Sequence, residues 1–166
     1  MTVILVSGTP GTGKTTLAKL ISERFGYHLL DVNKLIKRRN LAEGYDKLRD
    51  SLIVDVNKLS KVLVKMISRS HDVVVDSHLS HYLPPSCADA CLVTKCTLKE
   101  LKRRLEERYS QAKVRENLDA EVFDIIRNEA VELGHRVYIV RTTHGINLKR
   151  VKSILSKVSH DRQNHS

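Results

Sequence analysis

One glycine-rich segment of the sequence has the residue types and the spacing that phosphate binding requires. Residues 8–15 read Gly-Thr-Pro-Gly-Thr-Gly-Lys-Thr, which fits the pattern G-x-x-x-x-G-K-[ST] without departure. An apolar run precedes the segment and an amphipathic helical pattern follows it, as a phosphate-binding loop requires. Glycines let the backbone wrap around phosphate oxygens, and the N–H groups of the loop and of the following helix N-terminus face the anion. We predict a nucleotide-binding P-loop, and the alternative is a chance glycine-rich turn.

Three side chains in and after this segment are candidates for chemistry at the phosphates. Lys14 is placed to reach the β- and γ-phosphates, and the Thr15 hydroxyl is placed to ligate Mg²⁺. Asp76 ends the apolar run Val73–Val75, and parallel strands present functional groups at their carboxyl ends. Asp76 is therefore the expected second magnesium ligand, directly or through bound water. The alternative is that Asp76 caps a helix or belongs to a turn.

Histidines and cysteines gather in the next stretch of the sequence, at His78, His81, Cys87, Cys91 and Cys96. Their spacing matches none of the usual zinc patterns, so we do not expect a structural zinc site. Considered alone, His78 is either a group near the phosphates or a structural hydrogen-bonding partner. The odd number of cysteines argues against a disulfide framework and favours a reducing compartment, so we expect a cytoplasmic protein.

Two groups of basic residues could bind further phosphate groups. The first group comprises Lys34, Lys37, Arg38 and Arg39, and the second comprises Arg103, Arg104, Arg108, Lys113 and Arg115. Arginines stabilise the charge that phosphoryl transfer places on the equatorial oxygens, and a flap that closes over the site excludes water. We expect a short connecting flap over residues 109–115. The alternative is that both groups are solvated faces of helices.

Apolar runs alternate with helical patterns along the chain, which predicts an α/β fold with a parallel sheet. The expected strands are residues 3–6, 28–30, 73–75, 90–93 and 137–140. The expected helices are residues 17–25 before Gly26, 31–39 capped by Asp31, 52–66, 97–105 opened by a capping box, 118–134 and 148–158. The polar tail from Ser159 is expected to fray.

The composition narrows the class of protein. The 166 residues suit a single domain, and with 41% hydrophobic residues the chain is too apolar to be disordered. No apolar run is long enough for a membrane span, and the N-terminus shows no secretory signal pattern. The net charge of +10 favours nucleotides, RNA or an acidic protein surface as partners, or serves only solubility. Neither Asn-Lys pair is followed by the Asp of the N-K-x-D guanine motif, and the length suits a small kinase better than a helicase or transporter motor.

Taken together, the motifs resemble the adenylate kinase isoenzyme 6 family of small adenylate kinases. The resemblance rests on residues 8–16, Gly44-Tyr45-Asp46, Asp76-Ser77-His78, 104–109 and Glu116-Asn117-Leu118-Asp119-Ala120-Glu121-Val122-Phe123, and it extends over residues 1–158. It implies a P-loop kinase domain of nucleoside monophosphate kinase type, with a five-stranded parallel sheet flanked by helices. It also implies an acceptor-binding flap near residues 31–54 and a short lid near residues 107–116, followed by a polar tail at 159–166.

The resemblance further implies an activity and its residues. The activity is phosphoryl transfer between ATP and AMP with Mg²⁺, by a monomer that also hydrolyses ATP. The implied ATP-binding residues are Gly11, Thr12, Gly13, Lys14, Thr15, Thr16 and Arg108; the AMP-binding residues are Asp31, Lys37, Arg38 and Arg39; the catalytic residues are Lys14, Asp76, His78 and Arg108; the magnesium ligands are Thr15 and Asp76.

A role in maturation of the small ribosomal subunit is also implied, through a small-subunit ribosomal protein and the pre-ribosomal particle. Two other functions stay open. The chain could act mainly as an ATP-dependent assembly factor with incidental kinase activity. It could also be a small-metabolite kinase of shikimate or gluconate type, although the D-x-H motif and the E-N-x-x-A-E motif argue against that.

Overall fold

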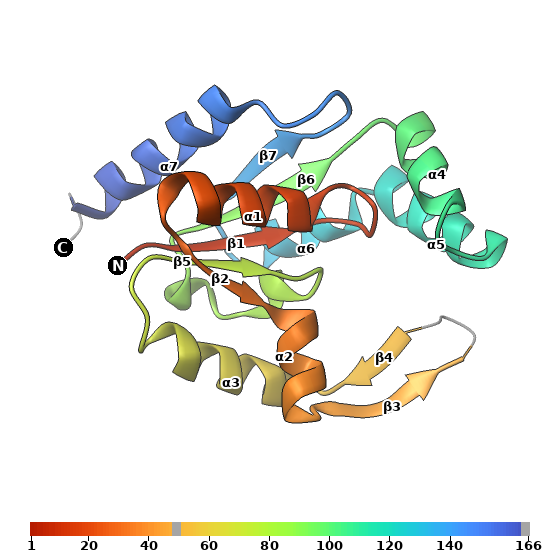
Figure 1. Cartoon of the computed structure of the whole chain (residues 1–166), viewed down its shortest axis with the longest axis horizontal. Helices are drawn as coiled ribbons and strands as arrows, with labels where there is room; N and C mark the ends of the chain where they lie inside the picture. The colour runs from red at the N-terminus through yellow and green to blue at the C-terminus, as the bar shows by residue number, and fades with distance from the viewer. Residues whose placement is uncertain (48–50, 164–166) are drawn as a thin grey trace.

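The central sheet has five parallel strands. The computed structural model describes residues 1–47 and 51–163. The strands lie in the order β2 (His28–Asp31), β5 (Val73–Asp76), β1 (Val3–Ser7), β6 (Ala90–Lys95) and β7 (Val137–Arg141). The predicted α/β class and the five predicted strands are confirmed. Because all five strands run the same way, their carboxyl ends meet at one edge, on the right in Figure 1.

Both faces of the sheet are covered, because successive side chains of a strand point to opposite sides. Val3 and Leu5 of β1 belong to a core cluster with α2 (Val32–Arg39), α3 (Val56–Ile67) and α6 (Ile125–Glu132). Ile4 and Val6 belong to a second cluster with α1 (Lys14–Phe25) and α7 (Leu148–Gln163). The fold therefore has three layers, with β1 at the centre of the middle layer (Figure 1).

A separate pair of helices lies beyond the carboxyl edge of the sheet (Figure 1). These helices are α4 (Leu98–Glu106) and α5 (Gln111–Val122), and they share a small apolar cluster around Leu101, Leu105 and Val114. The predicted connecting flap over residues 109–115 is wrong, because α5 already begins at Gln111. The turn between the helices is confined to residues 107–110, and it carries Arg108.

A two-stranded hairpin occupies part of the expected acceptor flap. Strands β3 (Ala42–Asp46) and β4 (Ser51–Val54) pair antiparallel, with Leu52 opposite Tyr45. The predicted helical start at Leu52 is therefore wrong. The helix starts at Val56 instead, because the Asp55 carboxylate accepts hydrogen bonds from the N–H groups of Asn57 and Lys58 at 2.8 and 3.1 Å. Residues 48–50 of the expected flap lie outside the described residues.

The predicted single helix over residues 118–134 is divided into two. Between α5 and α6, Asp124 adopts φ 53°, in the left-handed region that residues other than glycine seldom occupy. The Asp124 carboxylate forms ion pairs with Lys95 at the end of β6 and with Arg127 of α6. These ion pairs hold the break, so α6 leaves α5 in a new direction and packs against the sheet.

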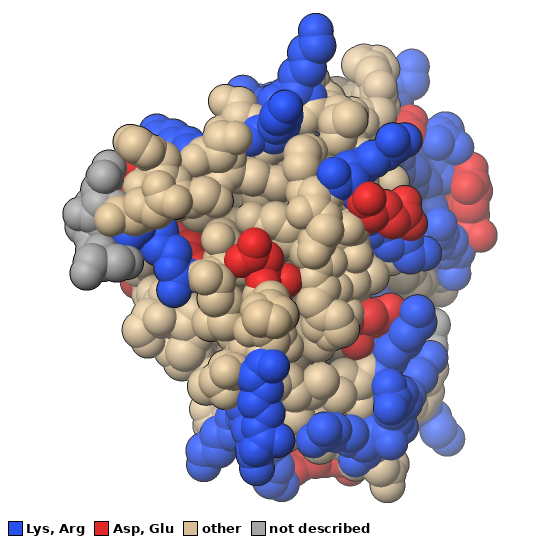
Figure 2. All heavy atoms as spheres, turned by 60° about the vertical axis from the view of Figure 1, so that its left-hand side comes forward, with Lys and Arg blue, Asp and Glu red and all other residues tan. Residues whose placement is uncertain are grey.

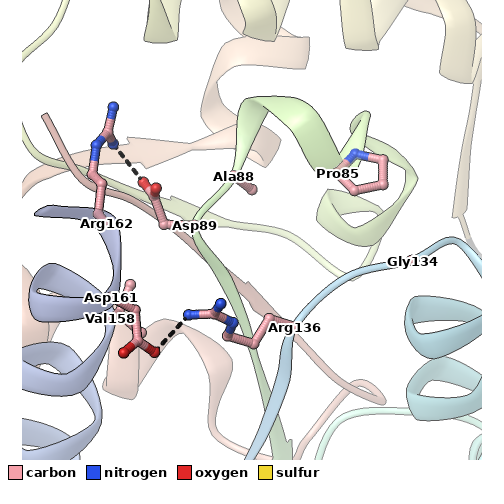
Figure 3. Close-up of a pocket in the computed structure, with 8 residues that line it drawn as sticks. All are labelled: Pro85, Ala88, Asp89, Gly134, Arg136, Val158, Asp161 and Arg162. Carbon is pink, nitrogen blue, oxygen red and sulfur yellow. Dashed lines mark hydrogen bonds and ion pairs between the residues drawn. The ribbon is translucent and has the colours of Figure 1, made fainter. Parts of the chain in front are cut away.

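The C-terminal helix continues further than the sequence predicted. α7 extends to Gln163, so the expected fraying from Ser159 is wrong for residues 159–163, and residues 164–166 lie outside the described residues. Figure 3 shows the contacts that fix its last turn beside a pocket of about 440 Å³. Arg162 pairs with Asp89 at 2.8 Å, and Asp161 pairs with Arg136 at 2.8 Å. Both partners directly precede sheet strands, so α7 is tied to the amino edge of the sheet.

One face of the molecule shows where basic side chains gather. Lys and Arg side chains collect at the lower end of the face in Figure 2, which is the level of α2 and α3, with acidic side chains among them. Lys61 and Lys65 of α3 and Arg69 after it are exposed. Within the described ranges, no helix combines the length and the apolar character that crossing a membrane demands.

Candidate nucleotide-binding site

The P-loop connects β1 to α1, as the sequence predicted. Three of its glycines have positive φ, with Gly8 at 144°, Gly11 at 86° and Gly13 at 95°. A Cβ atom at Gly8 would lie 2.5 Å from the Thr94 hydroxyl oxygen, so a larger residue would displace β6. Gly13 is the N-cap residue of α1, so the first N–H groups of that helix open into the loop. The backbone is thus shaped to surround an anion.

The interior of the loop is fixed by the carbonyl oxygen of Thr9. This oxygen accepts hydrogen bonds from the Thr12 hydroxyl at 2.7 Å, the Thr12 N–H at 3.2 Å and the Lys14 ammonium at 3.1 Å. The Thr12 hydroxyl also lies 2.7 Å from the Thr94 hydroxyl and is buried. The side chain of Thr12 therefore supports the loop from inside. Thr15 and Thr16, in contrast, are exposed at the start of α1.

Lys14 is partly buried and lies between two carboxylates. Burial lowers the pKa of Lys14 to about 8, and the negative charges of Asp76 and Glu121 limit the fall. The Lys14 ammonium donates a hydrogen bond to the Thr9 carbonyl oxygen of its own loop. A phosphate group would offer a better partner, because a charge-assisted hydrogen bond is stronger than one to a neutral carbonyl. The ammonium is thus positioned to exchange one partner for the other.

Asp76 and Thr15 come together at the ends of β5 and the P-loop. The Thr15 hydroxyl is close enough to the Asp76 carboxylate to favour its charged form, and Asp31 lies beside Asp76 in the register of β2 and β5. Burial raises the pKa of Asp76, and the Asp31 charge adds to this, while Thr15 and Lys14 oppose it. A hydroxyl and a carboxylate fit Mg²⁺, which prefers oxygen ligands. Within residues 1–47 and 51–163, no three His, Cys, Asp or Glu side chains form a group that could hold a metal ion.

The two histidines after β5 have different surroundings. His78 reaches solvent, and desolvation together with the charges of Lys14, His81 and Lys113 lowers its pKa to about 4. Its imidazole is therefore neutral at pH 7 and lies near Lys14. His81 is buried, with Nδ1 2.9 Å from the Ser7 hydroxyl and Nε2 3.0 Å from Glu129. The two histidines thus differ in exposure, because His78 reaches solvent within the influence of the Lys14 charge and His81 lies in the core.

A pocket of about 710 Å³ lies over the P-loop on the side of α4. It brings together most of the predicted ATP-binding residues, and its lining comprises Gly11, Gly13, Lys14, Thr15, Thr16, Leu20, Arg103, Arg104, Glu107, Arg108, Thr142, Gly145 and Ile146. Arg104 donates to the carbonyl oxygens of Gly11 at 3.3 Å and Thr142 at 2.8 Å. The role of Arg104 in holding the loop was not predicted, because these contacts join residues far apart in sequence.

Only one of the predicted AMP-binding residues lies near the P-loop site. Asp31 lies near Asp76 and caps α2, where its carboxylate accepts a hydrogen bond from the Lys34 N–H at 3.0 Å. Lys37, Arg38 and Arg39 are exposed on the last turn of α2 and do not line the pocket over the P-loop. Basic residues at this end of a helix also compensate its dipole. Their part in binding an acceptor remains a proposal.

Comparison with known proteins reveals relatives over most of the chain. A protein of Thermococcus onnurineus named "Putative adenylate kinase" is 41% identical over 142 residues, which cover 85% of this chain and 75% of the relative. A protein of the same name from Methanocaldococcus jannaschii is 32% identical, over 96% of this chain and 88% of the relative. The "Adenylate kinase isoenzyme 6 homolog" of Caenorhabditis elegans is 34% identical, over 78% of this chain and 72% of the relative.

Solved structures and a family model agree with this fold. A shikimate kinase from Acinetobacter baumannii, in complex with shikimate, matches with a TM-score of 0.64 at 17% identity, over 97% of this chain and 94% of that one. A gluconokinase from Sinorhizobium meliloti matches with a TM-score of 0.56 at 16% identity, over 98% and 94%. The model of an AAA domain family, AAA_18, matches residues 4–124. The resemblance read from the motifs is confirmed, and the chain belongs to the adenylate kinase isoenzyme 6 family.

Proposed function

We propose that this protein transfers a phosphoryl group between ATP and AMP. The observation that carries the proposal is the P-loop, in which the Lys14 ammonium lies near Thr15 and Asp76. The chain is also related to proteins named as adenylate kinases. Shikimate and gluconate kinases share the fold at 17% and 16% identity, which says nothing of the acceptor here. AMP is therefore inferred from the relatives.

The residues present account for the transfer by positioning and electrostatics. The loop N–H groups and Lys14 bind the phosphates of ATP, and Arg108 lines the same pocket from the turn before α5. Thr15 and Asp76 would hold Mg²⁺, which when bound neutralises phosphate charge. His78, neutral and beside Lys14, offers a hydrogen bond to the reacting group. No covalent intermediate on the protein is needed.

The test follows AMP, ADP and inorganic phosphate in one reaction mixture. With ATP, AMP and Mg²⁺, we expect both nucleotides to be converted to ADP with little phosphate released. Lys14→Ala, run in parallel, checks that the activity belongs to the P-loop. If AMP is not consumed while phosphate is released, the protein is an ATPase and the proposed transfer is wrong.

The proposal includes ATP hydrolysis and a role in small ribosomal subunit maturation, with a small-subunit ribosomal protein and the pre-ribosomal particle as partners. The support is the resemblance on the D-x-H and E-N-x-x-A-E motifs, the +10 charge and the solvent access of His78. The measurement is phosphate release without AMP, with and without purified small-subunit ribosomal proteins. A protein that acts mainly as an assembly factor would show a larger increase with a partner than with AMP.

A further inference from the structure

The outer face of α3 carries a basic line of three side chains. Lys61 and Lys65 belong to the helix, Arg69 lies in the turn after it, and all three are exposed. Positions four residues apart are neighbours on one helix face, about 6 Å apart along the axis. The buried residues of α3 lie two positions before each of these cations, at Leu59, Leu63 and Ile67. Because two residues turn a helix by about 200°, the basic line points away from the core.

The charge of the basic line is not neutralised within the described part of the chain. Over residues 1–47 and 51–163 none of its three cations forms an ion pair, whereas Lys58 at the start of α3 pairs with Glu43 and Asp55. In α4, by contrast, cations pair with glutamates of their own helix. Like charges four residues apart repel, and the helix dipole favours cations only in the last turn. The basic line is therefore better explained by an anionic partner than by stability.

The surroundings of the basic line favour a phosphate backbone over a protein or a membrane. The exposed large apolar side chains of the described residues all lie outside α2 and α3. A membrane-binding helix needs such side chains, and protein interfaces draw most of their energy from large anchors. Phosphate contacts need only positive charge. α2 and α3 together contain seven Lys and Arg residues and no Asp or Glu, and basic side chains collect at their level in Figure 2.

We propose that the basic line of Lys61, Lys65 and Arg69 binds the phosphate backbone of single-stranded RNA. One line of cations can follow one strand, and α2 and α3 contain no aromatic residue on which bases could stack, so binding is independent of base sequence. The choice of RNA rests on the pre-ribosomal partner in the proposed function, whereas the choice of a phosphate backbone rests on the charges. The basic line lies outside the pocket over the P-loop, so RNA does not compete with ATP.

The test uses a fluorescently labelled oligouridine RNA of about 12 nucleotides and measures its binding to the full chain by anisotropy. Titrations are made between about 50 and 200 mM salt, without ATP. The α3 variant replaces all three residues of the basic line by alanine. A charge-conserving variant combines Lys61→Arg, Lys65→Arg and Arg69→Lys. The matched control replaces three exposed cations of α7, on the other face of the sheet, by alanine: Lys149, Lys152 and Lys157.

We expect the α3 variant to weaken RNA binding by about tenfold or more at about 100 mM salt. The slope of log affinity against log salt should become shallower by about 2, because each phosphate contact on a single strand contributes about 0.7. The charge-conserving variant and the α7 variant should keep the wild-type slope. An equal loss in the α3 and α7 variants would be an effect of net charge and overturns the proposal.

Two further measurements separate the alternatives. Vesicles containing phosphatidylserine test a membrane partner: if vesicle binding depends on the basic line while RNA binding does not, the proposal is overturned. The melting temperature and the rate of ATP–AMP transfer should be unchanged in the α3 variant, because its substitutions lie on an exposed face outside the nucleotide pocket. A wild-type protein that binds RNA through the basic line but does not phosphorylate AMP would refute the proposed transfer and still support this inference.

Discussion

Lys14 is the residue on which the candidate site depends most. Its ammonium donates a hydrogen bond to the Thr9 carbonyl oxygen, and the negative charges of Asp76 and Glu121 act on it. A positive charge held in this way is costly in the folded protein and useful only when phosphate is present. The residue is therefore better explained by binding and catalysis than by stability.

Lys14→Ala is expected to lower turnover by about 100-fold or more, because one preorganised electrostatic contact to the reacting group contributes ~3–4 kcal/mol. The fold should persist, since the side chain bonds only one carbonyl oxygen within the loop. Initial rates and the melting temperature of the same preparation provide the check. A folded variant with unchanged turnover would contradict the assignment of the P-loop.

The two histidines after β5 should respond differently to substitution. His78→Ala is expected to lower turnover more than ATP affinity, because a neutral imidazole beside the phosphates acts mainly in the transition state. His81→Ala should lower the melting temperature, because it removes the buried hydrogen bond to the Ser7 hydroxyl and the contact with Glu129 and leaves a cavity in their place. Rates, ATP titrations and melting curves of both variants distinguish the roles. A parallel loss of affinity and rate in His78→Ala would make that residue structural.

The lowered pKa of His78 also predicts how stability depends on pH. The folded pKa of about 4 lies below the ordinary 6.5, so between these values the unfolded chain binds the extra proton. This part of the stability is present above pH 6.5 and is lost as the pH falls toward 4. His78→Ala should therefore flatten the decline in the free energy of unfolding over this window, and His71→Ala, exposed before β5, should not. Equal slopes in denaturant titrations of wild type and His78→Ala would refute this.

At the scale of the element, α7 shows how surface contacts extend a helix. Arg162 binds Asp89, whose carboxylate also accepts the N–H of Val3 at 2.7 Å. The first strand, the start of β6 and the last turn of α7 thus meet at one carboxylate at the amino edge of the sheet, and Figure 3 shows the contact of that carboxylate with Arg162. This edge lies at the opposite end of the strands from the P-loop, so it contributes stability without touching the site.

Arg162→Ala should therefore destabilise the protein without affecting turnover. A partly exposed ion pair contributes about 1 kcal/mol or less, which corresponds to about 2–4 °C in melting temperature for a chain of this size. Lys157→Ala, exposed on the same helix, is the control and should change little. A drop in turnover at equal stability would show that the amino edge communicates with the site.

The elements that sequence predicted best are those whose signal is contiguous. The strands, the P-loop and the start of α2 at Asp31 depend on neighbouring residues, and all are confirmed. The hairpin β3–β4 was missed because Leu52 continues the helical spacing of α3, although Asp55 ends it. The break at Asp124 was missed because no glycine or proline marks it, and its cause is Lys95 from a distant strand. The contact of Glu121 with Thr9 could not be predicted, because it joins residues 112 positions apart that meet only in the folded chain.

At the scale of the whole molecule, the candidate donor and acceptor sites lie on opposite sides of the P-loop. The pocket over the loop is bounded by α4 and by the segment after β7, toward one end of the sheet. Asp31 and α2 follow β2, the strand at the other end. The hairpin β3–β4 continues from α2 and projects beside the carboxyl edge (Figure 1). A phosphoryl group would thus pass along this edge in front of Lys14 and Asp76.

This separation predicts that the basic turn of α2 affects only the acceptor. Replacing Lys37, Arg38 and Arg39 together by alanine should raise the KM for AMP by about tenfold, because such charges act on the bound phosphate through charge-assisted contacts. The KM for ATP should stay unchanged, because these residues lie outside the pocket over the P-loop.

The matched control replaces Lys61 and Lys65 on the exposed face of α3 and Arg69 in the turn after it, which removes the same charge. If both triple variants raise the KM for AMP equally, the effect is one of net charge and α2 has no acceptor role. If the α2 variant raises the KM for ATP instead, the two sites are not separated along the sheet. A rise confined to AMP, and to the α2 variant, places the acceptor at the β2 end of the carboxyl edge, where Asp31 and Asp76 already lie side by side.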